Sequence, residues 1–296
     1  MIKAVIDIGT NSTRLFVADE KLNPIKKMLS TTRLGEGILS SPFMLDIAME
    51  RTSDKVKEFV EIAKGAGAEK IYIYTTAVVR EAKNKDVFAK MIFDKTGINL
   101  DIIPGFMEGE IAFLGAVQGF EAPAVIDIGG GSTEVVTKED NLLKALSLKT
   151  GGVRLKEQFE TQSGIIDITP IKEFLLENFI PKYKDSTDIL KAKTLIGVSG
   201  TPTTLASLCL GLKTYKPEVF QNKILLKKDL DKTLKHLASL TKEERKEFSG
   251  DFKDRADIIV FGGCILSAFM EYYNFDKLVI SDRDSLEGYL IKKATE

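Results

Sequence analysis

The sequence predicts an α/β protein with two similar domains that share one ligand. The first observation is a repeat, because Ala-Val-Ile-Asp-Ile-Gly occurs at residues 4–9 and again at residues 124–129, and both copies run through two variable residues into Ser-Thr. The copies lie 120 residues apart, which is too long for a solenoid unit and suits one copy per domain. Strand-like apolar runs also alternate with amphipathic helices, and 296 residues are enough for two domains with sizeable cores.

Hydrophobic periodicity and turn residues place the elements along the chain. We expect strands at residues 2–7, 14–18, 71–75, 100–103, 124–127, 134–136, 142–148, 194–198 and 278–281. We expect helices at residues 45–65, 105–119, 171–182, 230–240 and 258–272, after the turns at 76 and 154, and from residue 287.

Each copy of the repeat has the composition of a phosphate-binding turn that follows a buried strand. Glycine has no Cβ, so the chain can turn tightly and bring its backbone N–H groups close to an anion. We expect phosphate to bind at two turns, which consist of Gly9, Thr10, Asn11 and Ser12 and of Gly129, Gly130, Gly131 and Ser132. Asp127 ends the second strand, where a carboxylate can hold Mg²⁺. A turn-forming role alone would account for Asp-Ile-Gly, but not for the repeated strand before it.

The first turn leads into a strand and not into a helix. It lacks the Gly-Lys-Ser/Thr ending of a P-loop and the Gly-x-Gly-x-x-Gly of a dinucleotide-binding fold. These two classes of phosphate-binding protein are therefore disfavoured.

The charge distribution suits a small anionic ligand. The net charge is −1, so no overall field attracts the chain to nucleic acid or to a membrane surface, and we expect neither as a partner. Six of the eight arginines lie in or beside glycine-rich or turn-rich motifs, among them Arg33 and Arg80. Arginine can hold phosphate oxygens with two parallel hydrogen bonds. Ordinary salt bridges are the alternative at each of these positions.

Acid–base chemistry must fall to carboxylates, because the only histidine, His236, lies in an amphipathic surface helix. Glu108 lies in the first turn of the helix expected at residues 105–119, where the helix dipole alone would also favour a glutamate. Cys209 and Cys264 lie in apolar contexts and show no zinc spacing, which indicates a reducing compartment. We expect a cytoplasmic protein, since no secretory signal is recognisable and the apolar stretch at 258–269 is too short to cross a membrane.

A third anion site is expected at Ser-Gly-Thr-Pro, residues 199–202. Thr201 suits an N-cap and Pro202 a first helical residue. The free N–H groups of such a helix start, near Gly200 and Thr201, can bind an anion or a nucleotide.

Seven motifs in this order, spanning nearly the whole chain, resemble the exopolyphosphatase / guanosine pentaphosphate phosphatase (Ppx/GppA) family. They are Asp-Ile-Gly-Thr-Asn-Ser (7–12), Arg-Leu-Gly-Glu-Gly (33–37), Thr-Ala-Val-Val-Arg (76–80), Asp-Ile-Gly-Gly-Gly-Ser-Thr-Glu (127–134), Gly-Gly-Val-Arg-Leu (151–155), Ser-Gly-Thr-Pro-Thr-Thr (199–204) and Arg-Ala-Asp (255–257). Any one of them is weak evidence, whereas the ordered set is specific.

The resemblance implies two ribonuclease H-like domains of the actin-like ATPase type, each with a mixed sheet flanked by helices, and an active site in the cleft between them. We expect the domains at residues 1–119 and 120–284, with the last helix, about 285–296, packing back on the first domain. A homodimer is also implied. The chain resembles the short form of the family, without the histidine-aspartate domain of longer members.

The resemblance also implies that Glu108 is the catalytic base. Asp127 would hold Mg²⁺, with Asp7 or Glu134 assisting and Mn²⁺ as the alternative ion. The family usually has alanine after this glutamate where this chain has Gly109, but the spacing from Gly105 favours Glu108 over Glu110. Residues 285–288 read Ser-Leu-Glu-Gly where the family often has Leu-Arg-Glu-Gly, and the sequence leaves open whether Arg283 substitutes for that arginine.

These inferences lead to the hypothesis of a Mg²⁺-dependent exopolyphosphatase that releases terminal orthophosphate from inorganic polyphosphate. The close alternative is hydrolysis of guanosine pentaphosphate (pppGpp) to the tetraphosphate at the same site. A non-catalytic sensor of guanosine tetraphosphate is an alternative of a different class. A kinase or an actin-like filament protein of the same superfamily is less favoured.

Overall fold

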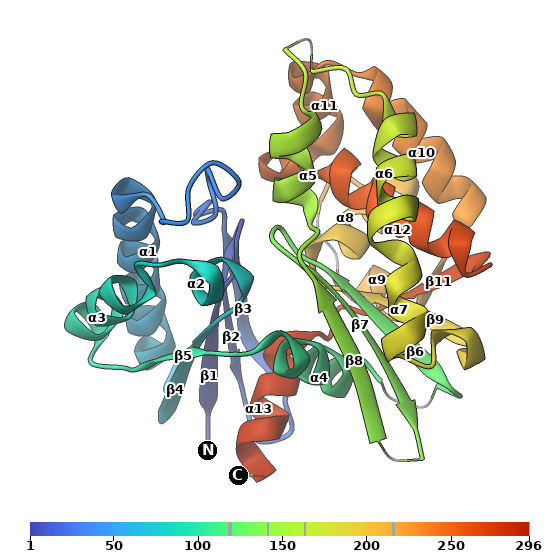
Figure 1. The fold of residues 1–296 in the computed structure, drawn as a ribbon. Helices are drawn as coiled ribbons and strands as arrows, with labels where there is room; N and C mark the ends of the chain where they lie inside the picture. Colours follow the sequence, from blue (N-terminus) through green and yellow to red (C-terminus); the bar gives the residue numbers. More distant parts are fainter. Residues whose placement is uncertain (118–119, 141, 163, 215–216, 296) are drawn as a thin grey trace.

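Two mixed β-sheets, one from each half of the chain, form the frame of the molecule (Figure 1). The computed structural model describes residues 1–117, 120–140, 142–162, 164–214 and 217–295. Helices pack against each sheet, and α4 and α13 lie between the two.

The first sheet has the strand order β3-β2-β1-β4-β5. Its strands are β1 (Lys3–Ile8), β2 (Thr13–Ala18), β3 (Pro24–Ser30), β4 (Lys70–Thr75) and β5 (Leu100–Ile102). The central strand β1 pairs antiparallel with β2 and parallel with β4. The accompanying helices are α1 (Asp46–Gly65), α2 (Ala77–Glu81) and α3 (Lys85–Thr96).

The second sheet repeats this order as β8-β7-β6-β9-β11 and adds β10 at its edge. Its strands are β6 (Pro123–Ile128), β7 (Thr133–Glu139), β8 (Leu142–Leu148), β9 (Thr194–Val198), β10 (Lys223–Leu226) and β11 (Lys277–Ile280). The helices of this half are α5 (Gly152–Phe159), α6 (Ile168–Asn178), α7 (Tyr183–Ser186), α8 (Gly200–Cys209), α9 (Pro217–Phe220), α10 (Lys227–Ser239), α11 (Lys242–Ser249) and α12 (Ile259–Tyr272). The prediction of two α/β units with mixed sheets is therefore confirmed.

The sequence repeat corresponds to one hairpin in each sheet. β1 and β2 pair Asp7 with Arg14, and β6 and β7 pair Asp127 with Glu134 at the equivalent register. Both strands of each hairpin are almost wholly buried, which accounts for their continuous apolar runs. Each hairpin thus places its glycine turn at the same end of its sheet.

Two glycines bring the helices between the sheets into close contact. α4 (Gly105–Ala116) and α13 (Ser285–Thr295) cross so tightly that a Cβ on Gly288 would lie 1.7 Å from the carbonyl oxygen of Ile111. A Cβ on Gly115 would lie 1.9 Å from the carbonyl oxygen of Asp284. The last helix of the chain also stacks Tyr289 on Tyr74 of β4, with ring centroids 4.6 Å apart, so it packs on the first sheet. The predicted domain boundary adjoins segment 118–119, which lies outside the described residues, and it stays a prediction.

Six helices and strands were not expected from the sequence, and one helix start was predicted wrongly. The unexpected elements are β3, β10, α3, α7, α9 and α11. β3 is a largely exposed edge strand with two adjacent lysines and so lacks the usual alternation. Thr201 is not an N-cap, because α8 begins at Gly200 after Ser199, and the Thr201 hydroxyl donates instead to the carbonyl of Ile128. Thr76 precedes α2, but its side chain makes no capping bond. Over the described part of the chain, every helix is too short or too polar to cross a membrane.

Candidate active site

The two repeated turns meet at the interface between the sheets. In each turn the N–H of the first glycine donates to the carbonyl of the serine three residues later, at 3.0 Å for both Gly9–Ser12 and Gly129–Ser132. A Cβ on Gly131 would lie only 2.6 Å from the Thr10 hydroxyl oxygen. The glycines of the second turn are therefore required for the close approach of the first turn.

A central cavity of about 80 Å³ lies where the turns meet. It is lined by thirteen of the sixteen predicted site residues, namely Asp7, Gly9, Thr10, Asn11, Ser12, Glu108, Asp127, Gly129, Gly130, Gly131, Ser132, Gly200 and Thr201. The other three, Arg33, Arg80 and Glu134, surround it without lining it. The structure thus brings together residues that are up to about 190 positions apart in the sequence.

Three buried carboxylates gather beside the second turn. Burial raises the pKa of Asp127 to about 8, and repulsion from Glu134 adds to this rise. Burial likewise raises the pKa of Glu134 to about 7. The pKa of Glu108 is raised well above its ordinary value by burial and then by repulsion from Glu134, while Arg80 opposes the rise. Carboxylates that repel one another in this way favour a bound cation or a shared proton.

Hydroxyl groups orient two of these carboxylates. Ser199 donates to Asp127 Oδ2 at 2.8 Å, and Ser147 of β8 donates to Glu134 Oε1 at 2.6 Å. Ser199 adopts a positive φ of 64°, which is uncommon for a residue with a side chain and places its hydroxyl at the end of β9.

The carboxylate of the first turn has a cationic partner. Arg14 Nη2 lies 2.6 Å from Asp7 Oδ2, and Arg14 also binds Asp284 and the Ser285 hydroxyl. Burial opposes the charge on Arg14, but Asp284 and Asp7 outweigh it, so the pKa of Arg14 is raised well above its ordinary value. Asp7 is therefore held mainly by arginine, while its buried Oδ1 has no hydrogen-bond partner within the described residues.

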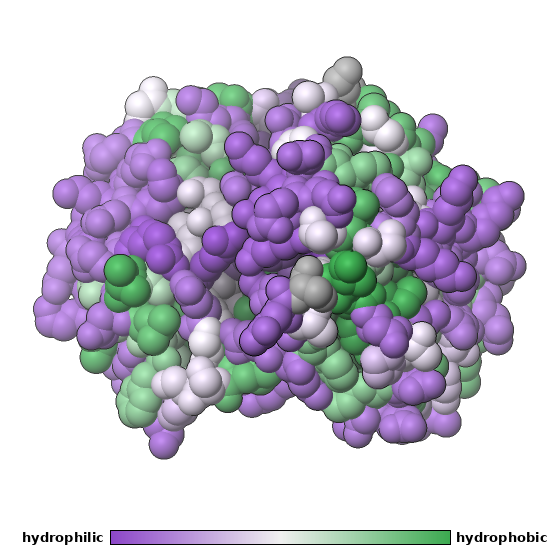
Figure 2. All heavy atoms as spheres, turned by 90° about the horizontal axis from the view of Figure 1, so that it is seen from above, coloured by the Kyte–Doolittle hydropathy of each residue, from purple (hydrophilic) through white to green (hydrophobic). Residues whose placement is uncertain are grey.

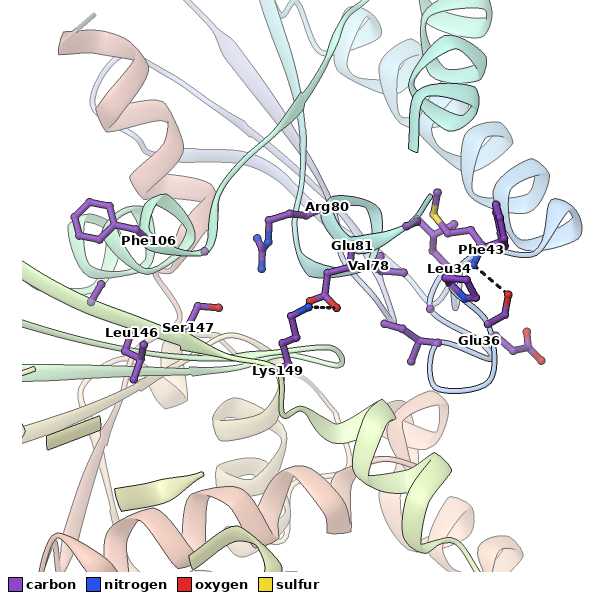
Figure 3. A pocket seen from close by; sticks show the side chains of 18 residues that line it. Leu34, Glu36, Phe43, Val78, Arg80, Glu81, Phe106, Leu146, Ser147 and Lys149 are labelled. Carbon is purple, nitrogen blue, oxygen red and sulfur yellow. Dashed lines mark hydrogen bonds and ion pairs between the residues drawn. The ribbon is translucent and has the colours of Figure 1, made fainter. Parts of the chain in front are cut away.

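The two arginines predicted to bind a phosphate chain lie in different cavities. Arg80 Nη1 donates to Glu108 Oε2 at 3.1 Å and to the carbonyl of Ile103 at 3.0 Å. It projects, near Ser147, into a cavity of about 770 Å³ that we call the Arg80 cavity (Figure 3). The Arg80 cavity is lined by Leu34, Gly35, Glu36, Ile38, Ser41, Pro42, Phe43, Met44, Val78, Arg80, Glu81, Ala82, Gly105, Phe106, Ala145, Leu146, Ser147 and Lys149. Arg33 lines a separate cavity beside Thr10 and Asn11.

The residues of the central cavity suit a divalent cation that a ligand helps to bind. Within the described residues, no three His, Cys, Asp or Glu side chains come close enough to form a metal site by themselves. Mg²⁺, however, is commonly held by one or two carboxylates together with water and substrate phosphates. The partnerless Oδ1 of Asp7 and the raised pKa of Asp127 fit an ion of that kind.

A model of the Ppx/GppA phosphatase family matches residues 5–296. The chain belongs to this family. It is 31% identical to the bifunctional 3-dehydroquinate synthase/phosphatase of Fusobacterium nucleatum over 98% of its own length, and it spans 46% of that protein. It is 28% identical to exopolyphosphatase 2 of Mycobacterium tuberculosis, with 98% of each chain covered. The crystal structure of an exopolyphosphatase from Cytophaga hutchinsonii superposes with a TM-score of 0.90 at 26% identity, covering 100% of this chain and 98% of the other.

For this Ppx/GppA phosphatase, three residues of the central cavity were missed as site residues. Arg14 and Ser199 were overlooked because their partners lie far away in sequence. Arg255 packs against Gly200, where a Cβ would lie 2.0 Å from its guanidinium. Burial lowers the pKa of Arg255 to about 10, and it forms no ion pair with any described residue. A half-buried guanidinium without an ion-pair partner is suited to bind an anion, and the Arg-Ala-Asp motif was the available signal for it.

Proposed function

We propose that this protein is an exopolyphosphatase, which releases terminal orthophosphate from inorganic polyphosphate by hydrolysis. The observation that carries the proposal is the meeting of two glycine turns around one cavity that also contains Glu108, Asp127 and the unpaired Arg255. Such a cavity combines anion-binding backbone groups with a buried acid–base residue. Phosphoryl transfer depends mainly on positioning and on neutralising charge.

The turns would hold the last phosphates of the chain. Residues 9–12 and 129–132 line the cavity, and so does Gly200 at the start of α8. Arg255 would supply positive charge from the second domain. The terminal phosphate is then held in one orientation, which is the larger part of what the reaction needs.

Glu108 would act as the general base. Arg80 fixes its side chain, and a raised pKa makes the ionised carboxylate a stronger base. The oxygen of an attacking water forms a bond to the terminal phosphorus while its proton passes to Glu108. The anhydride bond to the next phosphate breaks, and the shortened chain leaves with the bonding electrons.

Asp127 would hold Mg²⁺, with Glu134 or Asp7 assisting, and Mn²⁺ is the alternative ion. The ion would supply positive charge to the phosphate oxygens. Asp7 lines the central cavity and has an Oδ1 without a hydrogen-bond partner in the described structure, whereas Glu134 faces Asp127 across the hairpin and has no ion-pair partner there.

Phosphate release from long-chain polyphosphate and from pppGpp, measured in parallel with Mg²⁺, tests the proposal. Faster release from polyphosphate is the expected result. Faster release from the nucleotide would replace the proposal with a pppGpp 5′-phosphohydrolase. Release from neither substrate, together with tight binding of guanosine tetraphosphate, would make the protein a sensor. We also propose that the protein is a homodimer and is cytoplasmic. Light scattering of the purified protein tests whether it is a dimer.

A further inference from the structure

A cavity of about 280 Å³, which we call the lysine cavity, opens beside the first turn. It is lined by Thr10, Asn11, Arg33, Glu36, Val153, Lys156, Glu157, Lys242, Lys246, Asp257 and Ile258. Thr10, Asn11 and Ile258 also line the central cavity, so the two cavities adjoin. Its lining residues come mainly from the loop after β3 and from helices α5 and α11. These elements lie at the top of the molecule in Figure 1, and the face seen from above carries mostly hydrophilic side chains (Figure 2).

Each of the three acidic residues that line the lysine cavity contacts a partner, which for Glu36 is Arg51 at 3.5 Å, although Oδ1 of Asp257 has no hydrogen-bond partner within the described residues. Glu157 accepts hydrogen bonds from the backbone N–H groups of Gly37 and Leu39, at 2.9 and 2.8 Å. Asp257 lies 2.8 Å from Lys156 Nζ and 3.6 Å from Arg33.

Two lysines of α11 supply positive charge that this part of the molecule does not neutralise. Lys242 and Lys246 line the cavity one helical turn apart, and neither forms an ion pair with a described residue. Positive charge without local partners in a cavity next to the reaction site attracts a polyanion.

The other two cavities near the turns are less suited to a polyanion. The Arg80 cavity has an apolar wall, and its Lys149 is paired with Glu81 at 3.1 Å (Figure 3). A third cavity, of about 420 Å³, has four aspartates against three cationic side chains, and its lining includes Arg14, Lys27, Asp251, Asp254, Arg255, Asp282 and Asp284. A polyphosphate chain carries a negative charge on every phosphate. The aspartates of the third cavity would repel it, and the Arg80 cavity would bind it only weakly.

We propose that the lysine cavity is the subsite for the phosphate chain beyond the terminal groups, with Lys242 and Lys246 binding its distal phosphates. This inference rests on the proposed function and names the path of its substrate. Attacking and leaving oxygens lie roughly in line in phosphoryl transfer. Glu108 lines the central cavity and its partner Arg80 lines the Arg80 cavity, whereas the lysine cavity contains neither residue. The in-line arrangement is possible if the attacking water is activated at Glu108 and the leaving chain passes Arg33 and Lys156 on the other side.

The test is the double variant Lys242→Gln, Lys246→Gln, assayed on tripolyphosphate and on long-chain polyphosphate. A tripolyphosphate ends near the turns, so its KM and kcat should stay within about twofold of wild type. Long chains reach α11, so their KM should rise about tenfold at low salt. The difference should shrink at about 0.5 M NaCl, where exposed charges are screened.

The matched control is Lys228→Gln, Lys232→Gln on α10, which has the same spacing and lies outside the four cavities described. This control should change neither KM. An unchanged long-chain KM in the α11 variant would overturn the subsite while leaving the proposed function intact. An equal loss on both substrates would also overturn it, because the lysines would then act on the fold or the reaction and not on chain length. A wild-type protein inactive on both substrates would overturn the proposed function itself.

Discussion

The two repeated hairpins share a backbone but differ in charge. In the first, Asp7 faces Arg14; in the second, Asp127 faces Glu134 at the equivalent position. The turns have the same internal hydrogen bond, so the difference lies wholly in side chains. One hairpin carries a neutralised pair, whereas the other carries two like charges.

The two hairpins have the same glycine turn, but their side chains serve different purposes. Arg14 connects the first turn to Asp284 and Ser285 at the start of α13, so this half acts as a brace between distant parts of the chain. The second turn gathers Asp127, Glu134 and Glu108, whose raised pKa values indicate a site that is completed by a cation. Variants of the two halves should therefore differ in kind and not only in size.

The largest effect is expected from Glu108→Gln, which removes the proposed general base beside the second turn. Turnover of polyphosphate should fall by about 10²–10⁴-fold, the usual range for one general base. Steady-state phosphate release measures it. Glu110→Gln is the matched control, since Glu110 lies on the same helix and pairs with Lys292 at 2.9 Å. Near-normal turnover of the Glu108 variant would remove this residue from the mechanism.

Arg14→Gln should cause the next largest effect, on stability. The change leaves Asp7 and Asp284 buried without their cation, and breaking a buried pair in this way costs about 3–5 kcal/mol. Urea unfolding at pH 7 measures this loss. Arg14→Lys should lose less, because it keeps the charge. A Gln variant as stable as wild type would show that the brace contributes nothing.

The equivalent change in the second hairpin is Glu134→Gln. It should raise the free energy of unfolding, whereas Arg14→Gln should lower it. The folded pKa of Glu134 is raised from 4.5 to about 7, so the folded state retains a proton that the unfolded state has lost. Stability of the metal-free protein therefore falls as pH rises from about 4.5 to 7 and stays low above that range. The variant should gain about 2 kcal/mol at pH 8 and show a flatter pH profile.

Urea unfolding from pH 5 to 8 without divalent ions follows both proteins. A loss of stability in Glu134→Gln as large as that in Arg14→Gln would mean that the two hairpins are equivalent after all, which contradicts the comparison.

The smallest effect is expected from Ser199→Ala, which removes the hydroxyl that orients Asp127. Loss of such a supporting bond weakens metal binding about 10–100-fold, so we expect the Mg²⁺ concentration for half-maximal turnover to rise about tenfold. Ser285→Ala is the counterpart beside the first turn, where the serine hydroxyl bonds Arg14. Ser285→Ala should leave the Mg²⁺ concentration for half-maximal turnover unchanged. If this concentration rose equally in both variants, the metal site would not be confined to the second turn.

Much of the candidate site could be predicted because it is local in sequence. The turns at residues 9–12 and 129–132 follow from glycine after a buried strand, and thirteen predicted residues do line one cavity. Arg33 and Arg80 were both expected to bind the phosphate chain, yet they lie in separate cavities. The sequence around each arginine does not show on which side of the turns its loop packs. Arg14 and Asp284 are 270 positions apart, and neither sequence context indicates the other.

The sequence alone determined the two hairpins, their shared glycine turns and the family, since backbone conformation after a buried strand depends on neighbouring residues. Which carboxylate has a counter-ion depends on how the chain folds. Arg14 neutralises Asp7 because α13 returns to the first sheet with Asp284, whereas Glu134 faces Asp127 without a cation. Ionisation energies depend on burial and on charges that the fold brings within a few ångströms, and the order of residues along the chain does not contain that distance.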